Sequence, residues 1–189
     1  PSGVVTDGLY DYLAYWIGAM KAQKLRNELR DMQITEPRLA QILRDRSEWL
    51  ASRYGFDLQL VGVCTRNRGT LFDDNGLDPA ALLEALARTG DLRGLPALRE
   101  WRPEDAIEHA GADVLIELSP TDLVSGEPAT GYIRRALANG MHAITANKGP
   151  IALHFAELRM LAAEAGLYLG FEGTVMSGTP GLRTAWSSL

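Results

Sequence analysis

The segment T-A-N-K-G-P, residues 145–150, contains a lysine whose type and position suggest acid–base chemistry. Lys148 is the only lysine after residue 24, in a chain that otherwise uses arginine for its positive charge. Arginine stays protonated at neutral pH, whereas a partly buried lysine amine can exchange a proton with an alcohol or carbonyl oxygen. The segment follows an apolar stretch typical of a strand, so Lys148 is predicted to lie where that strand ends. A solvated loop lysine is the alternative interpretation.

Two hydroxyl residues, Ser119 and Thr121, lie in the loop E-L-S-P-T-D that follows another strand-like stretch. Their side chains and backbone N–H groups can hydrogen-bond the ribose or the nicotinamide of a dinucleotide cofactor. Ordinary turn formation around Pro120 explains the same residues without any ligand. The loop is therefore a candidate cofactor contact with a structural alternative.

A pair of arginines, Arg66 and Arg68, follows the first strand-like stretch, which ends at Cys64. At this position in a dinucleotide-binding fold, Asp or Glu holds the ribose 2′-hydroxyl of NAD, whereas arginine accommodates the 2′-phosphate of NADP. The two arginines therefore favour NADP over NAD. Solvated loop arginines would produce the same pattern.

The segment E-G-T-V-M-S-G-T-P, residues 172–180, combines glycines with small hydroxyl residues and must turn sharply. A sharp turn can direct several carbonyl oxygens at one point, and oxygen ligands suit a hard cation. A plain connector between domains has the same composition. The three histidines, His109, His142 and His154, do not have the spacing of metal ligands, so structural roles are predicted for them.

Helical and strand-like patterns alternate from about Glu36 onward, and these elements must position the loops. Apolar stretches at 58–64, 113–118, 142–145 and 167–172 are predicted to be buried strands. Apolar spacing and end signals from proline and glycine predict helices at about 37–55, 78–88, 103–110, 131–139 and 151–165. Strands that alternate with helices and lack a polar face indicate an α/β fold with a doubly wound parallel sheet. Ligands bind at the carboxyl ends of the strands in this architecture.

Composition and charge limit the kinds of molecule that this chain is expected to bind. It has 189 residues, of which 46% are hydrophobic and 23% charged, as in an ordinary soluble domain. A net charge of −5 with dispersed arginines argues against nucleic acid as a partner. The apolar segment 9–20 is shorter than a membrane helix needs, so no membrane partner is expected. Cys64, the only cysteine, excludes an internal disulfide and favours a reducing, cytoplasmic compartment.

Four segments together resemble homoserine dehydrogenase: V-L-I-E-L-S-P-T-D, I-R-R-A-L-A-N-G, H-A-I-T-A-N-K-G-P-I-A and F-E-G-T-V-M-S-G-T-P. They occur in the family's order and spacing, and the resemblance runs from about residue 38 to residue 182. It implies a Rossmann-like domain of an aspartate-pathway enzyme that interconverts homoserine and aspartate 4-semialdehyde with NAD or NADP. Such an enzyme lies on the route to threonine, methionine and isoleucine, and the resemblance implies a homodimer in its complete form.

The same resemblance implies roles for individual residues. Lys148 matches the family's catalytic lysine, which serves proton transfer beside the cofactor. Ser119 matches a cofactor-contacting hydroxyl, and Thr121 lies next to it. A monovalent cation, usually sodium, is implied at Glu172, Val175, Ser177 and Thr179.

Two departures from the family pattern shape the expected domain organisation. The family's G-x-G-x-x-G turn, which meets the cofactor pyrophosphate, has no counterpart here, because residues 32–35 lead straight into Glu36. The family's substrate domain also has no counterpart before Leu189. We therefore expect a helical extension over 1–35, a partial dinucleotide-binding domain over 36–172 and the start of a linker over 173–189. The missing turn favours the alternative, a non-catalytic α/β module derived from this family.

Overall fold

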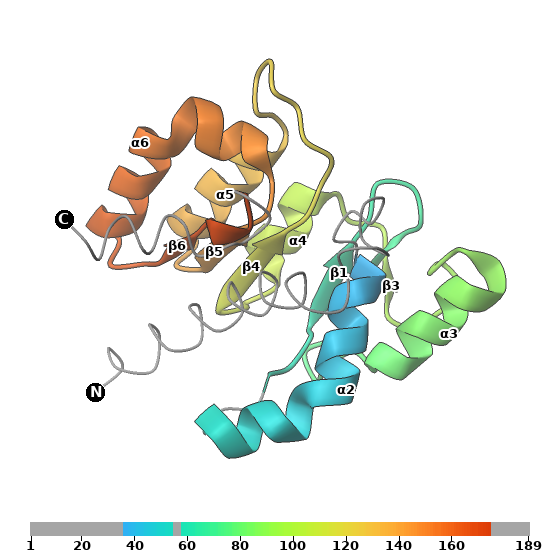
Figure 1. The fold of residues 1–189 in the computed structure, drawn as a ribbon. Coiled ribbons are helices and arrows are strands. Elements are labelled where there is room, and N and C mark those ends of the chain that lie inside the picture. Colours follow the sequence, from blue (N-terminus) through green and yellow to red (C-terminus); the bar gives the residue numbers. More distant parts are fainter. Residues whose placement is uncertain (1–35, 55–57, 175–189) are drawn as a thin grey trace, which may run out of the picture. The chain divides into compact units, whose positions relative to one another are not determined.

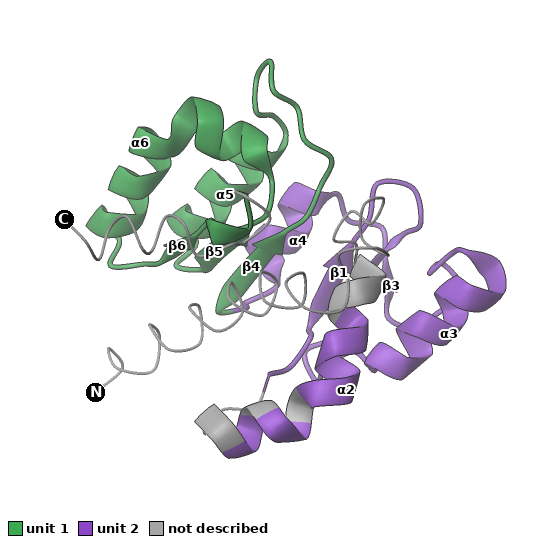
Figure 2. Ribbon diagram, in the orientation of Figure 1, with its two compact units in different colours: residues 1–33, 113–189 green, residues 34–112 purple. Residues whose placement is uncertain are grey.

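The computed structural model describes residues 36–54 and 58–174, which form helices and short strands (Figure 1). These residues divide into two compact units, one ending at Ala112 and the other beginning at Asp113 (Figure 2). Following the colours of Figure 2, the described residues up to 112 are unit 2 and those from 113 to 174 are unit 1. The predicted extension over 1–35, and all but the first two residues of the predicted linker, lie outside the described residues.

Unit 2 is built on a small antiparallel sheet. Its described helices are α2 (Glu36–Tyr54), α3 (Pro79–Thr89) and α4 (Pro103–His109), and its strands are β1 (Gly62–Cys64), β2 (Thr70–Phe72) and β3 (Leu98–Arg99). The central strand, β2, pairs antiparallel with both β1 and β3. Its middle residue, Leu71, packs with Leu82 and Ala85 of α3 and with Leu92, and these four side chains form the buried core of this unit.

Helix α3 begins and ends at the signals that its sequence carries. The Asp78 side chain accepts a hydrogen bond from the backbone N–H of Ala80 at 2.8 Å, and Pro79 occupies the first helical position. Gly90 follows the last turn with a φ of +68°, a left-handed conformation that glycine adopts without steric cost. These ends fix the helix so that Leu82 and Ala85 face the core.

Unit 1 is a sequence of β–α–β crossovers around a parallel sheet. Its described elements are β4 (Val114–Glu117), α5 (Ala129–Ala138), β5 (His142–Thr145), α6 (Lys148–Glu164), β6 (Leu169–Gly170) and the 3-10 helix η1 (Glu172–Thr174). Strand β5 lies between β4 and β6 and is parallel to both. Glu117 and Thr145 are opposite each other at the end of this register, so β4 and β5 end side by side.

The core of unit 1 lies between the sheet and its two helices. Ile133 and Leu137 of α5 pack with Ala143 of β5 and with Leu158 and Ala162 of α6. Ile133 and Leu158 are fully buried. Burying a side chain of this size stabilises the folded state by about 1.5–3 kcal/mol. This apolar core packs α5 and α6 against β5.

The expected α/β class with a parallel sheet is confirmed, and the first part of the chain adds a feature that we did not predict. The strand expected at 58–64 is shorter, and it pairs antiparallel with β2, which we had not assigned as a strand. Three residues are too few to show a hydrophobic period, and only a short loop separates β2 from β1, as antiparallel pairing allows. No described helix combines the length and the apolar character that a membrane crossing requires.

Candidate functional site

A buried carboxylate joins the carboxyl ends of β4 and β5. Glu117 is 3% exposed, and its Oε2 accepts a hydrogen bond from Thr145 Oγ1 at 2.8 Å. Its Oε1 accepts another from the backbone N–H of Ser119 at 2.7 Å. Thr145 Oγ1 in turn accepts from the backbone N–H of Asn147 at 2.9 Å. The loops that follow the two strands are therefore attached to the same side chain.

Asn147 connects the same two loops from the other side. Its Oδ1 accepts from the backbone N–H of Gly149 at 3.1 Å, which makes it the N-cap of α6. Its Nδ2 donates to the carbonyl oxygens of Ser119 at 3.2 Å and Pro120 at 3.4 Å. Asn147 is almost completely buried, so these contacts are shielded from water. The start of α6 is thus tied to the loop after β4.

Two of the residues predicted to act on a cofactor or substrate lie here: Ser119 is in the loop after β4, and Lys148 directly follows the loop after β5. Lys148 is the first residue of α6, and its side chain is exposed, whereas the sequence argument had invoked a partly buried amine. Ser119 Oγ is buried, and it has no hydrogen-bond partner within the described part of the chain. Thr121 is exposed and lies two residues further along the same loop. Unit 1 therefore presents a buried hydroxyl that an incoming polar group can satisfy.

The loop between β4 and α5 packs directly on the start of α6. A Cβ added to Gly149 would overlap the carbonyl oxygen of Asp122 and lie 3.1 Å from Gly126 Cα. Gly126 itself has a φ of +75°. His154 Nε2 donates to the Ser125 carbonyl at 2.9 Å, which adds a contact one helical turn later. The loop that carries Ser119 and Thr121 is held against α6 by backbone approach that only glycine permits.

A surface ion-pair network holds the far end of this loop. Arg134 of α5 forms a bidentate pair with Glu157 of α6, at 2.6 Å and 2.8 Å, and reaches Glu127 at 2.9 Å. Glu127 also accepts from the backbone N–H of Gly131 at 2.8 Å. The hydrogen bond from Arg134 lowers the pKa of Glu157. Exposed pairs of this kind add little stability individually, and here they fix the approach of the loop to α5.

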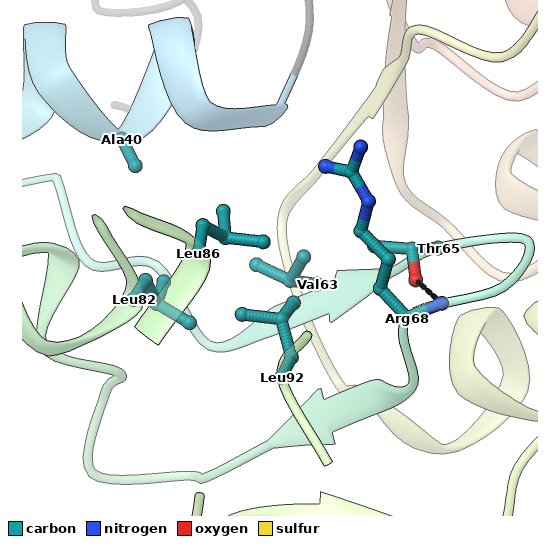
Figure 3. Close-up of a pocket in the computed structure, with 7 residues that line it drawn as sticks. All are labelled: Ala40, Val63, Thr65, Arg68, Leu82, Leu86 and Leu92. Atoms are coloured by element: carbon teal, nitrogen blue, oxygen red, sulfur yellow. Dashed lines mark hydrogen bonds between the residues drawn. The ribbon is translucent and has the colours of Figure 1, made fainter. Parts of the chain in front are cut away.

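The two arginines predicted to select NADP lie in unit 2, in the loop between β1 and β2. Thr65 shapes this loop: its Oγ1 donates to the Gly69 carbonyl at 2.9 Å. The same Oγ1 accepts from the backbone N–H of Arg68 at 2.9 Å (Figure 3). Arg66 and Arg68 are both exposed. The hollow shown in Figure 3 holds about 20 Å³, room for roughly one water molecule, so it is not a cofactor cavity.

Only one of the four residues predicted to bind a cation is described. Glu172 begins η1 and is half-buried, and Thr174 closes that turn by donating to the Phe171 carbonyl at 2.6 Å. The other three, Val175, Ser177 and Thr179, lie outside the described residues. Within the described ranges, no cluster of three or more His, Cys, Asp or Glu side chains can hold a metal ion. The predicted cation site relies on backbone oxygens, so it stays a prediction.

His142 and Cys64 take part in packing contacts within their own units. His142 Nδ1 accepts from the backbone N–H of Tyr168 at 3.0 Å, and burial lowers the pKa of His142 while Asp113 opposes that shift. Cys64 Sγ lies 3.0 Å from Thr70 Oγ1, and burial raises the pKa of the Cys64 thiol. His142, Cys64 and Thr70 are strand residues, and Tyr168 immediately precedes β6, so both contacts contribute to local packing.

Sequence reasoning missed Glu117, Thr145 and Asn147 as site residues. All three stand inside the segments that drew attention to Ser119 and Lys148. The available signal was a carboxylate at the end of an otherwise apolar strand, V-L-I-E, because a charged residue is seldom fully buried without a partner. Its partner, Thr145, is 28 residues away in the chain and becomes its neighbour only through the parallel register.

A parallel sheet whose polar loops and capped helix meet at the carboxyl ends of the strands is typical of α/β nucleotide-binding domains. Residues 33–172 match the family model described as the NAD binding domain of homoserine dehydrogenase. An NAD(+)-dependent homoserine dehydrogenase of Pseudomonas canavaninivorans is 41% identical over 152 residues, which are 80% of this chain and 43% of that protein. A homoserine dehydrogenase of Methanocaldococcus jannaschii is 32% identical over 80% of this chain and 45% of its own length.

Solved structures agree with these matches. A hyperthermophilic archaeal homoserine dehydrogenase in complex with NADPH superposes with a TM-score of 0.64 at 28% identity, covering 77% of this chain and 43% of that one. The chain therefore belongs to the homoserine dehydrogenase family, whose NAD-binding domain it contains, and the predicted resemblance is confirmed. It spans a little under half the length of these relatives.

Proposed function

We propose that this chain forms the dinucleotide-binding part of a homoserine dehydrogenase, an NAD(P)-dependent oxidoreductase that interconverts homoserine and aspartate 4-semialdehyde. The observation that carries the proposal is the buried Oγ of Ser119 at the carboxyl edge of the parallel sheet, which finds no hydrogen-bond partner among the described residues. Leaving a buried hydroxyl unsatisfied costs about 1–3 kcal/mol, so a ligand group that reaches it gains affinity. An amide or a ribose hydroxyl of a nicotinamide cofactor is such a group.

The residues of unit 1 fit the nicotinamide end of the cofactor. Ser119 can accept from or donate to the carboxamide or the ribose, and Thr121 offers a second hydroxyl on the same loop. A bound nicotinamide dinucleotide supplies the hydride acceptor that turns an alcohol into an aldehyde. The part that we assign to the chain is proton transfer at the substrate oxygen by the Lys148 amine, at the start of α6.

We infer NADP as the favoured cofactor from Arg66 and Arg68. Both guanidinium groups are exposed on a loop shaped by Thr65, and arginine suits a 2′-phosphate because its planar fork makes bidentate contacts. One relative is named NAD(+)-dependent and another was solved with NADPH, so the preference has to follow from this chain's own residues. Arg68→Asp is expected to shift the ratio of affinities toward NADH, and Arg159→Asp, the same charge change on α6, is the control. An unaltered ratio contradicts the role.

We further propose the remaining family properties for the complete enzyme. These are a monovalent cation, sodium, at Glu172, Val175, Ser177 and Thr179, a homodimer, and a cytoplasmic enzyme of threonine, methionine and isoleucine biosynthesis with no nucleic-acid or membrane partner. The support is membership of the family together with a net charge of −5. Of these four residues Glu172, at the start of η1, is the described one.

Titration of the purified chain with NADPH and NADH, followed by cofactor fluorescence, tests the proposal together with an assay of homoserine oxidation. Binding without turnover supports a dinucleotide-binding part of the enzyme. Neither binding nor turnover supports the alternative, a non-catalytic module, which the absence of a G-x-G-x-x-G sequence favours.

The role of Lys148 is tested in a full-length relative. Replacing the matching lysine by alanine is expected to abolish turnover while cofactor affinity is kept. Replacement by arginine is the control: it keeps the positive charge but exchanges no proton near neutral pH. If turnover survives in either variant, proton transfer by this lysine is wrong.

A further inference from the structure

We propose that Glu117 is a positioning residue that fixes the loop carrying Ser119 relative to the start of α6, and with it the Lys148 backbone. The inference rests on the proposed function of this edge of the sheet, and it adds a residue for which no cofactor contact is proposed. Glu117 acts through backbone groups of the two loops, whereas Ser119 and Lys148 face the ligand.

Four residues form a closed ring of hydrogen bonds. Glu117 accepts from the Ser119 N–H and from the Thr145 hydroxyl. The ring continues from Thr145 Oγ1 to the N–H of Asn147, and from the Asn147 side-chain amide to the Ser119 carbonyl. The Ser119 backbone is therefore held at both its N–H and its C=O. The side-chain hydroxyl is the polar group of Ser119 that this ring leaves unpaired.

The direction of these bonds requires a carboxylate at position 117. The backbone N–H of Ser119 can only donate, and the Thr145 hydroxyl donates its single proton to Glu117 Oε2 while its oxygen accepts from the Asn147 N–H. Both oxygens of residue 117 therefore have to accept, which an ionised carboxylate does and a carboxamide cannot. Glutamine keeps only one acceptor oxygen here: its NH₂ group would either oppose the Ser119 N–H or donate to Thr145 Oγ1, and in the second case the Thr145 proton loses its acceptor. The ring is specific for the charge of Glu117 as well as for its size.

The ring ends at the first turn of α6. Asn147 is both a member of the ring and the cap of this helix, through the Gly149 N–H. Lys148 lies between Asn147 and Gly149 in the chain. A change at Glu117 or Thr145 is therefore transmitted through Asn147 to the backbone on which Lys148 is mounted.

The test uses the full chain with Thr145→Val, Thr145→Ser, Glu117→Gln and, as a control, Glu164→Gln at the exposed end of α6. Amide hydrogen exchange, resolved by NMR, reports on the Ser119 and Asn147 N–H groups, and fluorescence titration gives the Kd for NADPH. Thr145→Val is expected to speed exchange at both amides by about tenfold or more, the loss typical of a buried hydrogen bond to a charged group. The Ser119 amide is the decisive one because Thr145 does not touch it.

We expect Thr145→Val and Glu117→Gln to raise the Kd for NADPH about tenfold, and Thr145→Ser, which restores the hydroxyl, to return exchange and Kd to within about twofold of the parent chain. Glu164→Gln should change neither. Unchanged protection of the Ser119 amide in Thr145→Val overturns the ring, and faster exchange with an unaltered Kd overturns its functional consequence. If the parent chain does not bind NADPH, the proposed function fails, while the exchange data still decide whether Glu117 fixes the two loops.

Discussion

Gly149→Ala tests whether the loop after β4 lies against α6 as closely as the structure indicates. The added Cβ would overlap the Asp122 carbonyl oxygen and lie 3.1 Å from Gly126 Cα and 3.2 Å from the carbonyl carbon of Asp122. All three atoms belong to the backbone, so no side chain can turn away to make room. Overpacking of this kind costs about 1–3 kcal/mol. Alanine regains up to about 1 kcal/mol through its higher helix propensity.

Because the atoms that the added Cβ meets belong to the backbone, the upper end of the overpacking cost applies, and the net expectation for Gly149→Ala is a loss of about 2 kcal/mol in the free energy of unfolding. We also expect weaker NADPH binding as the Ser119 loop moves. Urea unfolding followed by circular dichroism measures the first effect and fluorescence titration the second. Gly94→Ala is the matched control, because no atom of the described residues lies within 4 Å of the Cβ it would add and its backbone is not left-handed. A Gly149→Ala variant as stable as the parent, with unchanged affinity, would refute the close packing.

Three further outcomes follow from the core and the charged groups of unit 1. Leu158→Ala, at a fully buried position, is expected to lower the free energy of unfolding by about 2–5 kcal/mol in urea titrations, whereas Met160→Ala, largely exposed on the same helix, should change it by less than about 0.5 kcal/mol. Burial lowers the pKa of His142 in the folded state, so the neutral imidazole stabilises the fold fully above about pH 6.5, and this stabilisation is lost as the pH falls through the folded pKa. His142→Gln should flatten that part of the plot of unfolding free energy against pH. Arg134→Met should raise the pKa of Glu157 toward its ordinary value in an NMR titration, and an unmoved pKa would show that the bidentate pair does not form in solution.

Local signals along the chain located every described α-helix, but the start of α6 was predicted at 151 and lies at Lys148, where Asn147 caps the helix. Pro79 and Gly90 bound α3 as predicted, and Pro103 begins α4. Gly140 and Gly166 follow α5 and α6 within two residues. Each of these signals acts within one turn of its own helix, so it can be read without knowledge of the rest of the fold. The apolar runs that became β4 and β5 were equally readable because parallel strands are buried on both faces.

The pairing of strands and loops that are distant in the chain could not be predicted from the sequence. Strand β2 is three residues long, and only its antiparallel partners, β1 and β3, define it. The same holds for the ring at the site: Asn147 was visible as part of a motif, but its contact with the Ser119 carbonyl depends on β4 and β5 ending side by side. The sequence specifies the residue types and their spacing along the chain, whereas the register of the sheet determines which distant residues come into contact.

Glu117 and Lys148, the two charged residues discussed at this edge of the sheet, each lower the stability of the fold at their positions. This argues that they serve function rather than stability. Glu117 ends an apolar strand and is 3% exposed, so its desolvation is costly, and an apolar residue of similar volume often serves stability as well or better. Lys148 is the first residue of α6, the end at which the helix dipole disfavours a cation by about 0.3–1 kcal/mol. Two stability preferences are therefore violated in neighbouring segments: a charge is buried, and a cation stands at a helix N-terminus. The core of unit 1 follows the usual preference for buried apolar residues. Such a local conflict is expected where residues are retained for function. The carboxylate specifies one arrangement of the loops, and the proposed function needs such an arrangement to direct the Ser119 hydroxyl and the Lys148 amine at cofactor and substrate.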